Sequence, residues 1–430
     1  MNYELIKNLK RRNIEAFYCP TAKEAVEKVS SLINDGDTVT WGGSATVREL
    51  GLPDLLKSRG TLNVLDRDSV PTPEEKQQIY LQAFSADVFL TSANAISEDG
   101  VIVNIDGNGN RQVLTQENGW NSAIFSSDMS CFISVWSDAA HPYVYTLYNN
   151  KGKQVRTILD NKRLETELAE FNLPQPKFFS FTTPENVELN GWMMRPADFD
   201  EAKKYPVIMH QYSGPGSQQV TDSWRIGSMR AGALFDAYLT QQGFIVVCVD
   251  GRGTGARGAR FEKQIYQCMG ELESHDQVEA ALYLATLPYV DKDRIGIWGW
   301  SYGGFNTLMS MSEGRPVFRC GVAIAPPTNW KYYDSVYTER YMRTPQENPD
   351  GYAVNPIQRA ENMHGALLLC HGLADDNVHP QNMFEYTEAL VQADKDFREL
   401  IYTNRNHGIS GGNTRQHLLR QVVNHFMENL

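Results

Sequence analysis

The chain has 430 residues, a net charge of −12 and an isoelectric point near 5.3, and this acidic balance excludes the basic face on which nucleic-acid binding depends. Apolar residues make up 41% of the chain, which allows packed cores, but apolar runs such as Phe244–Val249 fall far short of the ~20 residues that span a bilayer. At roughly 150 residues per domain, two or three domains are expected.

The N-terminal residues lack the apolar segment and the cleavage site of a secretory signal. By default this favours the cytoplasm, while the localisation stays unknown. The six cysteines form no C-x-x-C pair, so neither a zinc site nor a thioredoxin motif is predicted. Three of them lie in apolar runs and are expected to be buried: Cys248, Cys320 and Cys370.

Residues 1–113 alternate between helix and strand patterns, which predicts a three-layer α/β segment. One helix is expected over Glu24–Ile33, and a second is expected to open at Gly42-Gly43-Ser44 and to end near Pro53. The expected strands are Thr38–Trp41, Asp87–Leu90 and Val101–Ile105, the last followed by a hairpin turn at 106–109.

Between about residue 114 and residue 180 the pattern changes to strands separated by Asp, Asn and Gly turns. It predicts one antiparallel meander, which leaves its faces and edges uncovered unless another element packs on them. The strands are expected at Phe132–Trp136, Tyr143–Tyr148 and Gln154–Leu159.

In residues 181–430 short apolar strands alternate with helices such as Asp276–Thr286 and Phe384–Ala393. This pattern is typical of a doubly wound α/β sandwich, in which parallel strands are covered on both faces. The strands are expected at Pro206–Tyr212, Phe244–Asp250, Arg294–Trp298, Cys320–Ala325, Ala366–Cys370 and Arg398–Tyr402.

The strongest motif is Gly299-Trp300-Ser301-Tyr302-Gly303, which lies between the strand Arg294–Trp298 and a helical run, Phe305–Met311. G-x-S-x-G in this context indicates a nucleophile elbow. The turn is so tight that side chains beside the serine would clash, which explains the glycines, and the helix that follows stabilises negative charge near its N-terminus. The alternative is an ordinary Gly/Ser turn.

An elbow serine requires an acid and then a histidine later in the chain. The loop after strand Ala366–Cys370 carries Asp375 and Asp376, and the pattern does not distinguish between them. Among the later histidines, His379 is too close in sequence to Asp375 to reach across to a serine. His417 and His425 fall within a helical pattern. Elimination leaves His407, in a loop at the same end of the sheet.

Two cofactor interpretations are rejected. Gly253–Gly258 matches G-x-G-x-x-G, and Glu273 lies about 20 residues further on. In a dinucleotide fold that acid ends the next strand, whereas here the next strand begins only near Arg294. The glycines are instead expected to let a loop pass close to other backbone. Ligand spacing is also missing around His364, His371 and His379, so no cofactor or metal is predicted.

Several stretches closely resemble the C-terminal part of the dipeptidyl peptidase IV enzymes of the prolyl oligopeptidase family: VDGRGTGARG, IWGWSYGGF, YYDSVYTERYM, HGLADDNVH and the NHGI loop. The resemblance covers residues 116–430. It implies an α/β-hydrolase fold with Ser301 as nucleophile, His407 as general base and Asp375 as the acid that orients the base.

The same resemblance implies an oxyanion site and a substrate pocket. The hydroxyl of Tyr212 and the backbone N–H of Tyr302 would stabilise the oxyanion. Near the pocket, Pro327 stands where many relatives carry valine. The proline pocket would be formed by Tyr302, Trp330, Tyr333, Tyr337, Asn377 and Val378.

Members of this family carry an N-terminal β-propeller that gates the cavity and supplies paired glutamates for the free amino terminus of the substrate. Residues 114–180 correspond to at most its last blade, and no glutamate of this chain matches that pair. The dipeptide-releasing specificity is therefore in question, although the triad is retained.

Residues 1–113 resemble the lactate-utilisation protein domain through Trp41-Gly42-Gly43-Ser44 and Thr91–Arg111. The glycine loop is a candidate anion site, with Asp99 and Asn104 as candidate polar residues, and tight-turn chemistry is the alternative. Both resemblances break off within a domain near Arg111–Leu114, so we hypothesise a rearrangement or an assembly error. Sequencing the source DNA across this junction tests that hypothesis.

Three domains are thus predicted: a lactate-utilisation-like segment (1–113), a propeller-blade remnant (114–180) and an α/β-hydrolase domain (181–430). The predicted function is that of a serine peptidase acting on peptides with proline at the penultimate position, as a monomer or a homodimer. A less selective serine esterase and a non-catalytic fusion product are the alternatives.

Overall fold

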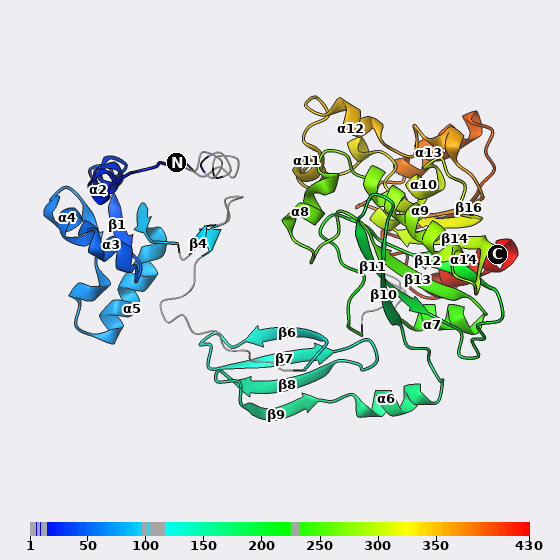
Figure 1. Cartoon of the computed structure of the whole chain (residues 1–430), viewed down its shortest axis with the longest axis horizontal. Coiled ribbons are helices and arrows are strands. Elements are labelled where there is room, and N and C mark those ends of the chain that lie inside the picture. Colours follow the sequence, from blue (N-terminus) through cyan, green and yellow to red (C-terminus); the bar gives the residue numbers. More distant parts are fainter. Residues whose placement is uncertain are drawn as a thin grey trace. The chain divides into compact units, whose positions relative to one another are not determined.

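The computed structural model describes Ile6, Leu9 and residues 15–93, 95–96, 102–103, 117–224 and 233–430. The chain divides into two compact units, Met1–Val113 and Leu114–Leu430 (Figure 1). The predicted boundary at residue 180 lies within the second unit, and the division into three domains stays a prediction. No helix in the described ranges is long and apolar enough to cross a membrane.

The N-terminal unit contains a small parallel sheet in the order β2-β1-β3. Its central strand β1 (Thr38–Trp41) and edge strand β3 (Val88–Leu90) lie where strands were predicted, whereas the short β2 (Asn63–Leu65) was missed. Within residues 15–93, the α-helices of this unit are α2 (Ala22–Ser31), α3 (Ala45–Glu49), α4 (Leu52–Ser58) and α5 (Pro73–Gln82).

The single helix expected from Ser44 to Pro53 was wrong. The chain breaks at Gly51, whose φ of +68° ends α3, and Pro53 stands in the first turn of α4, where no backbone N–H is required. Ser44 caps α3 by accepting a hydrogen bond from the Val47 N–H, so this loop performs a capping role, and its anion site stays a prediction. Asp99, Asn104 and the turn at 106–109 lie outside the described residues.

The second unit begins with the meander that the sequence predicts. Strands β6 (Trp120–Phe125), β7 (Cys131–Ser137), β8 (Val144–Asn149) and β9 (Gln154–Leu159) pair antiparallel in chain order, and only β6 was missed. Every residue of β9 is exposed, as expected for an isolated blade-like sheet. Its assignment as a propeller blade stays a prediction. Helix α6 (Lys162–Ala169) follows the meander.

The rest of the second unit is built on a mixed sheet in the order β10-β11-β13-β12-β14-β15-β16-β17. Strand β11 runs antiparallel to both neighbours, and the strands from β13 to β17 pair in parallel. The strands span Lys177–Thr182 (β10), Glu188–Met194 (β11), Tyr205–His210 (β12), Ile245–Asp250 (β13), Val290–Trp300 (β14), Cys320–Ile324 (β15), Ala366–Gly372 (β16) and Arg398–Tyr402 (β17).

Helices cover both faces of this sheet, which confirms the predicted α/β-hydrolase architecture (Figure 1). Successive side chains of β13 point to opposite faces of the sheet, and apolar residues on both faces need cover. Val247 packs with helices on one face, and Val246 and Cys248 pack with helices on the other. Helices α9 (Glu271–Ala285), α10 (Tyr302–Met311) and α13 (Gln381–Gln392) pack on the first face, and α7 (Ala233–Gln241) and α14 (Thr414–Asn429) on the second.

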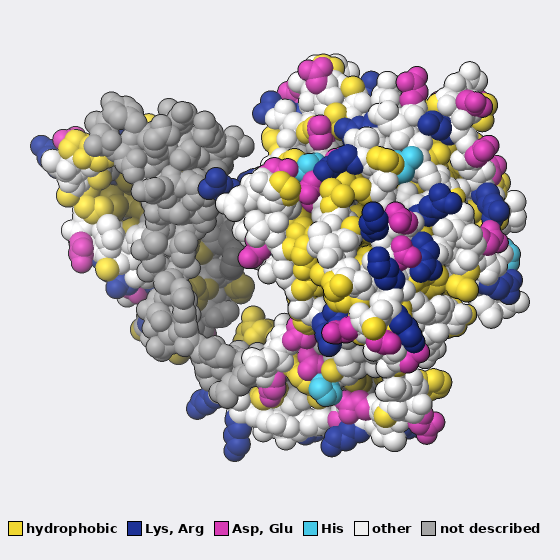
Figure 2. Space-filling model, turned by 45° about the vertical axis from the view of Figure 1, so that its right-hand side comes forward, with side chains coloured by type: hydrophobic (Ala, Val, Ile, Leu, Met, Phe, Trp, Pro, Cys, Tyr) yellow, Lys and Arg dark blue, Asp and Glu magenta, His cyan; other side chains and the backbone are white. Residues whose placement is uncertain are grey.

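The other α-helices in residues 233–430 are short connections. They are α8 (Ala259–Glu262), α11 (Ser335–Met342) and α12 (Pro349–Ala353). All three cysteines expected to be buried are buried. On the face that Figure 2 shows, acidic and basic side chains of the larger unit are interspersed.

Candidate active site

The predicted nucleophile stands in a tight turn between β14 and α10. Ser301 has a φ of +61°, a left-handed conformation that side chains rarely adopt, and its N–H donates to the carbonyl oxygen of Ile324 at 2.8 Å. A Cβ on Gly299 would stand 2.7 Å from the carbonyl oxygen of Gln211 and would also collide with Gly303. The two glycines therefore permit the turn, as the sequence predicts.

The structure brings Ser301, His407 and Asp375 together in one hydrogen-bonded chain. Nε2 of His407 lies 2.9 Å from Oγ of Ser301, and its Nδ1 lies 2.7 Å from Oδ2 of Asp375. Because a carboxylate only accepts, Nδ1 carries the proton and Nε2 presents its lone pair to the serine hydroxyl. Asp376, which the sequence pattern left open, is exposed in the same loop.

Asp375 is buried and surrounded by donors. Its Oδ1 accepts hydrogen bonds from the backbone N–H groups of Asn377 and Val378, at 3.0 and 2.9 Å. Burial by itself would raise the pKa of this carboxyl, but hydrogen bonds from His371 and His407 lower the pKa well below its ordinary value. The carboxylate therefore stays ionised and can stabilise an imidazolium at His407.

His371 is a contact of this site that the sequence analysis did not assign. It is fully buried at the end of β16, with Nε2 2.9 Å from the carbonyl oxygen of Val378 and 3.4 Å from Oδ2 of Asp375. Its Nε2 thus faces both the acid and a residue three positions later in the same loop. The signal available in the sequence was its position at the end of an apolar run, where a buried polar side chain needs a partner.

The side chains of the two predicted oxyanion residues are neighbours, and Tyr302 directly follows Ser301 in the chain. Tyr212 follows β12, and its ring centroid lies 6.0 Å from that of Tyr302. The segment is held by the buried Gln211, whose side-chain N–H₂ donates to the carbonyl oxygen of Gly303 at 2.6 Å. Gln211 was also missed, because its partners are remote in sequence.

The predicted pocket residues form one aromatic cluster next to the elbow. The ring of Trp330 lies 5.3 Å from that of Tyr302, 6.0 Å from that of Tyr333 and 6.1 Å from that of Tyr337. The hydroxyl of Tyr333 donates to Oδ1 of Asn377 at 2.9 Å, and Val378 is buried. The arrangement can offer flat apolar walls and one amide to a ligand.

The rejected dinucleotide motif has the structural role that the sequence predicts for it. A Cβ on Gly255 would stand 2.5 Å from the carbonyl oxygen of Gly216, and Gly216 in turn donates its N–H to the carbonyl oxygen of Gly253 at 2.9 Å. The loop therefore passes close to other backbone. Glu273 does not end a strand: it lies buried in the first turn of α9.

Among the described residues, Glu185, His275 and Glu279 form a group of side chains that could hold a metal ion, with ligand atoms within 4.8 Å of one another. Two of these side chains stand on α9 and the third on the loop between Thr182 and Glu188. Arg315 already pairs with Glu279 at 2.5 Å and lies 3.0 Å from Nδ1 of His275, so its guanidinium supplies positive charge there.

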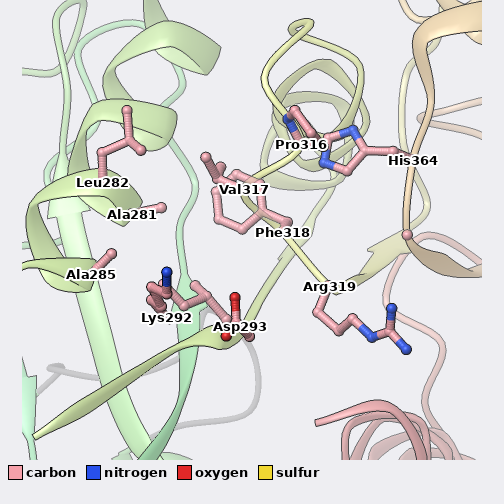
Figure 3. Close-up of a pocket in the computed structure, with 12 residues that line it drawn as sticks. Ala281, Leu282, Ala285, Lys292, Asp293, Pro316, Val317, Phe318, Arg319 and His364 are labelled. Atoms are coloured by element: carbon pink, nitrogen blue, oxygen red, sulfur yellow. The ribbon is translucent and has the colours of Figure 1, made fainter.

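A hollow of about 500 Å³ lies near the amino ends of the parallel strands, whereas Ser301 follows the carboxyl end of β14. Figure 3 shows its walls, with Leu282 and Ala285 of α9 on one side and Val317 and His364 on the other. These residues precede or flank the amino ends of the parallel strands. Ligands of open α/β sheets bind outside the carboxyl ends, where the triad lies.

Comparison with known proteins agrees with this geometry. The model of the prolyl oligopeptidase family matches residues 235–430, and the LUD domain model matches residues 3–116. Dipeptidyl peptidase 4 of Bos taurus is 39% identical over 296 residues, which cover 66% of this chain and 37% of the relative. The Sus scrofa protein of the same name is likewise 39% identical over 296 residues, covering 66% of this chain and 37% of that protein.

The same similarity is seen among solved structures. The crystal structure of Porphyromonas gingivalis dipeptidyl peptidase 4 superposes with a TM-score of 0.73 at 45% sequence identity. The match covers 76% of this chain and 46% of that one. The chain thus spans less than half the length of these relatives.

Proposed function

Because residues 235–430 belong to the prolyl oligopeptidase family, we propose that the chain is a serine peptidase that hydrolyses peptide bonds after proline at the penultimate position. Ser301, His407 and Asp375 are its proposed triad. The observation that carries the proposal is the continuous hydrogen-bonded chain from Ser301 through His407 to Asp375, at 2.9 and 2.7 Å.

The reaction follows from these positions. His407 Nε2 takes the hydroxyl proton as Ser301 Oγ attacks the carbonyl carbon of the proline residue. The backbone N–H of Tyr302 and the hydroxyl of Tyr212 donate to the resulting oxyanion. His407 then gives the proton to the leaving amine nitrogen, the C–N bond breaks, and an acyl-enzyme ester remains on Ser301.

A water molecule completes the cycle. It loses a proton to His407, its oxygen attacks the ester carbon, and the proton is returned to Ser301 Oγ as the acid is released. The charge on Asp375 stabilises the imidazolium in both halves of the reaction. The aromatic cluster around Trp330 provides flat walls for the pyrrolidine ring of proline.

Release of p-nitroaniline from Gly-Pro-p-nitroanilide tests the proposal. Ser301→Ala is expected to lower the turnover by about 10⁶, because no other group can form the acyl-enzyme. Ser310→Ala is the matched control, since that buried hydroxyl of α10 donates only within its helix, to Asn306. Equal rates for wild type and Ser301→Ala would contradict the proposal. Faster turnover of short esters than of the proline anilide would favour the esterase.

A further inference from the structure

Glu273 is a buried carboxyl that the reaction does not use. It is fully inaccessible in the first turn of α9, a position that glutamate rarely occupies without a partner. Its Oε1 accepts a 2.6 Å hydrogen bond from the hydroxyl of Tyr302, and its Oε2 accepts one from the N–H of Gly270 at 2.9 Å. Burial raises the pKa of Glu273 to about 8 despite these donors.

The partner of this carboxyl occupies a central position in the site. Tyr302 follows the nucleophile directly, and its ring stands among those of Tyr212, Phe305 and Trp330, with centroids 6.0, 5.3 and 5.3 Å away. Ring contacts of this kind tolerate sliding and tilting. The hydrogen bond to Glu273 is directional, so it fixes where the phenol ring lies along the cluster.

The backbone of Glu273 is tied to the oxyanion segment as well. The side-chain N–H₂ of Asn306 lies 3.4 Å from the carbonyl oxygen of Glu273 and 3.2 Å from Oε1 of Gln211, the residue before Tyr212. Asn306 of α10 thereby links the first turn of α9 to Gln211, which directly precedes Tyr212. Tyr302, the other residue proposed to face the oxyanion, contacts the Glu273 side chain itself. All these groups are buried, where a hydrogen bond lost to substitution is not replaced by water.

We infer that Glu273 is a positioning residue for proline recognition, which acts by holding the hydroxyl of Tyr302 and so fixing the pocket wall nearest the nucleophile. This inference rests on the proposed peptidase function. A wall displaced by 0.5–1 Å already forfeits about a quarter to a half of its contact energy with a rigid ring. Substrates with a small flexible residue in place of proline depend less on that wall.

The test compares hydrolysis of Gly-Pro-p-nitroanilide and Gly-Ala-p-nitroanilide by wild type, Glu273→Leu, Tyr302→Phe and the double variant. Leucine is used because glutamine would retain an oxygen that can accept from the Tyr302 hydroxyl. Each single variant is expected to lower the Gly-Pro over Gly-Ala ratio of kcat/KM by about tenfold, mainly through a higher KM for the proline substrate. The double variant should lose no more than the single ones, because both remove the same contact. Glu271→Leu, at a half-exposed position in the same helical turn, is the matched control and should change the ratio less than about twofold.

Labelling of Ser301 by diisopropyl fluorophosphate, which contains no proline, reports whether the triad of each variant is intact. If Glu273→Leu fails to fold, Tyr302→Phe alone carries the test, since it removes only the hydroxyl. An unchanged ratio, or additive losses in the double variant, would overturn the inference and leave the peptidase function standing. A wild type that is labelled but cleaves neither anilide would overturn both.

Discussion

The indole N–H of Trp300 donates a 3.0 Å hydrogen bond to the backbone carbonyl oxygen of His407. The residue before the nucleophile therefore holds the loop that carries the base. The guanidinium of Arg415 lies over the Trp300 ring at 4.7 Å and donates to the carbonyl oxygen of Gly408, so the same loop is held at His407 and at the residue that follows it. The separation of Ser301 and His407 depends on these contacts.

Replacing Trp300 by phenylalanine removes the N–H and keeps an aromatic ring. The freed loop is expected to lower kcat for the proline anilide by about tenfold or more, with little change in KM. Trp298→Phe is the control: this tryptophan is equally buried on β14, and its N–H has no hydrogen-bond partner among the described residues. Comparable losses of kcat in the two variants would refute the role given to the hydrogen bond.

Gly303→Ala tests the closeness of the elbow to the oxyanion segment. A Cβ at this position would collide with the carbonyl oxygen of Gln211 and stand 3.2 Å from Cα of Tyr212. We expect a cost of about 1–3 kcal/mol in the free energy of unfolding and a loss of about 10² in kcat, because the reacting groups shift apart. Gly60→Ala, with open space around the added methyl, should change neither quantity in urea unfolding and anilide assays.

Asp375→Asn retains the size of the side chain and removes its charge. The amide favours the wrong tautomer of His407, so kcat should fall by about 10⁴. Asp376→Asn, at the exposed neighbouring position, should stay within about threefold of wild type. Steady-state rates with the proline anilide decide, and a larger loss in Asp376→Asn would reassign the acid.

Tyr212→Phe removes the hydroxyl proposed to face the oxyanion and leaves the ring beside Tyr302. The loss is expected in kcat, by about 10²–10³, because the donor acts on the tetrahedral intermediate. Tyr333→Phe, which removes the donor to Asn377 in the pocket wall, should instead change mainly KM. A Tyr212→Phe variant with normal kcat would exclude the hydroxyl from the oxyanion site.

The buried carboxyl of Glu273 predicts a pH dependence of stability. Its pKa rises from 4.5 to about 8 on folding, mainly through burial, so the folded state binds the proton more tightly. The stabilisation is complete below pH 4.5 and is lost as the pH rises through about 8, by at most about 1.4 kcal/mol per pH unit.

Glutamine does not titrate, so Glu273→Gln does not lose this stabilisation as the pH rises, whereas wild type does. The free energy of unfolding of the variant minus that of wild type should therefore increase from pH 6 to pH 8. Urea unfolding at the two pH values measures it, and the other titrating groups largely cancel in the difference. A difference that is constant with pH would show that Glu273 has the same pKa in both states.

Most of the parallel sheet could be predicted because its strands are short apolar runs, and β17 (Arg398–Tyr402) has the predicted bounds. The failures have local causes. Strand β2 (Asn63–Leu65) is too short to show a period. The helix expected to continue from Ser44 to Pro53 is interrupted because Gly51 adopts a positive φ, which the apolar pattern does not reveal.

By itself the sequence determined that the chain carries a nucleophile elbow, because Gly299 and Gly303 flank a serine between a strand and a helix. It also located the acid and base loops, since each follows a strand of the same parallel sheet. The local pattern left Asp375 and Asp376 open and only the family resemblance favoured Asp375. The tertiary structure places Asp375 against His407, because neighbouring loop residues differ in direction and burial. The structure also shows Glu273, the acid of the rejected dinucleotide pattern, in contact with Tyr302, 29 residues away in the chain. Contacts of this kind depend on how helices pack on a sheet, and no local pattern encodes that packing.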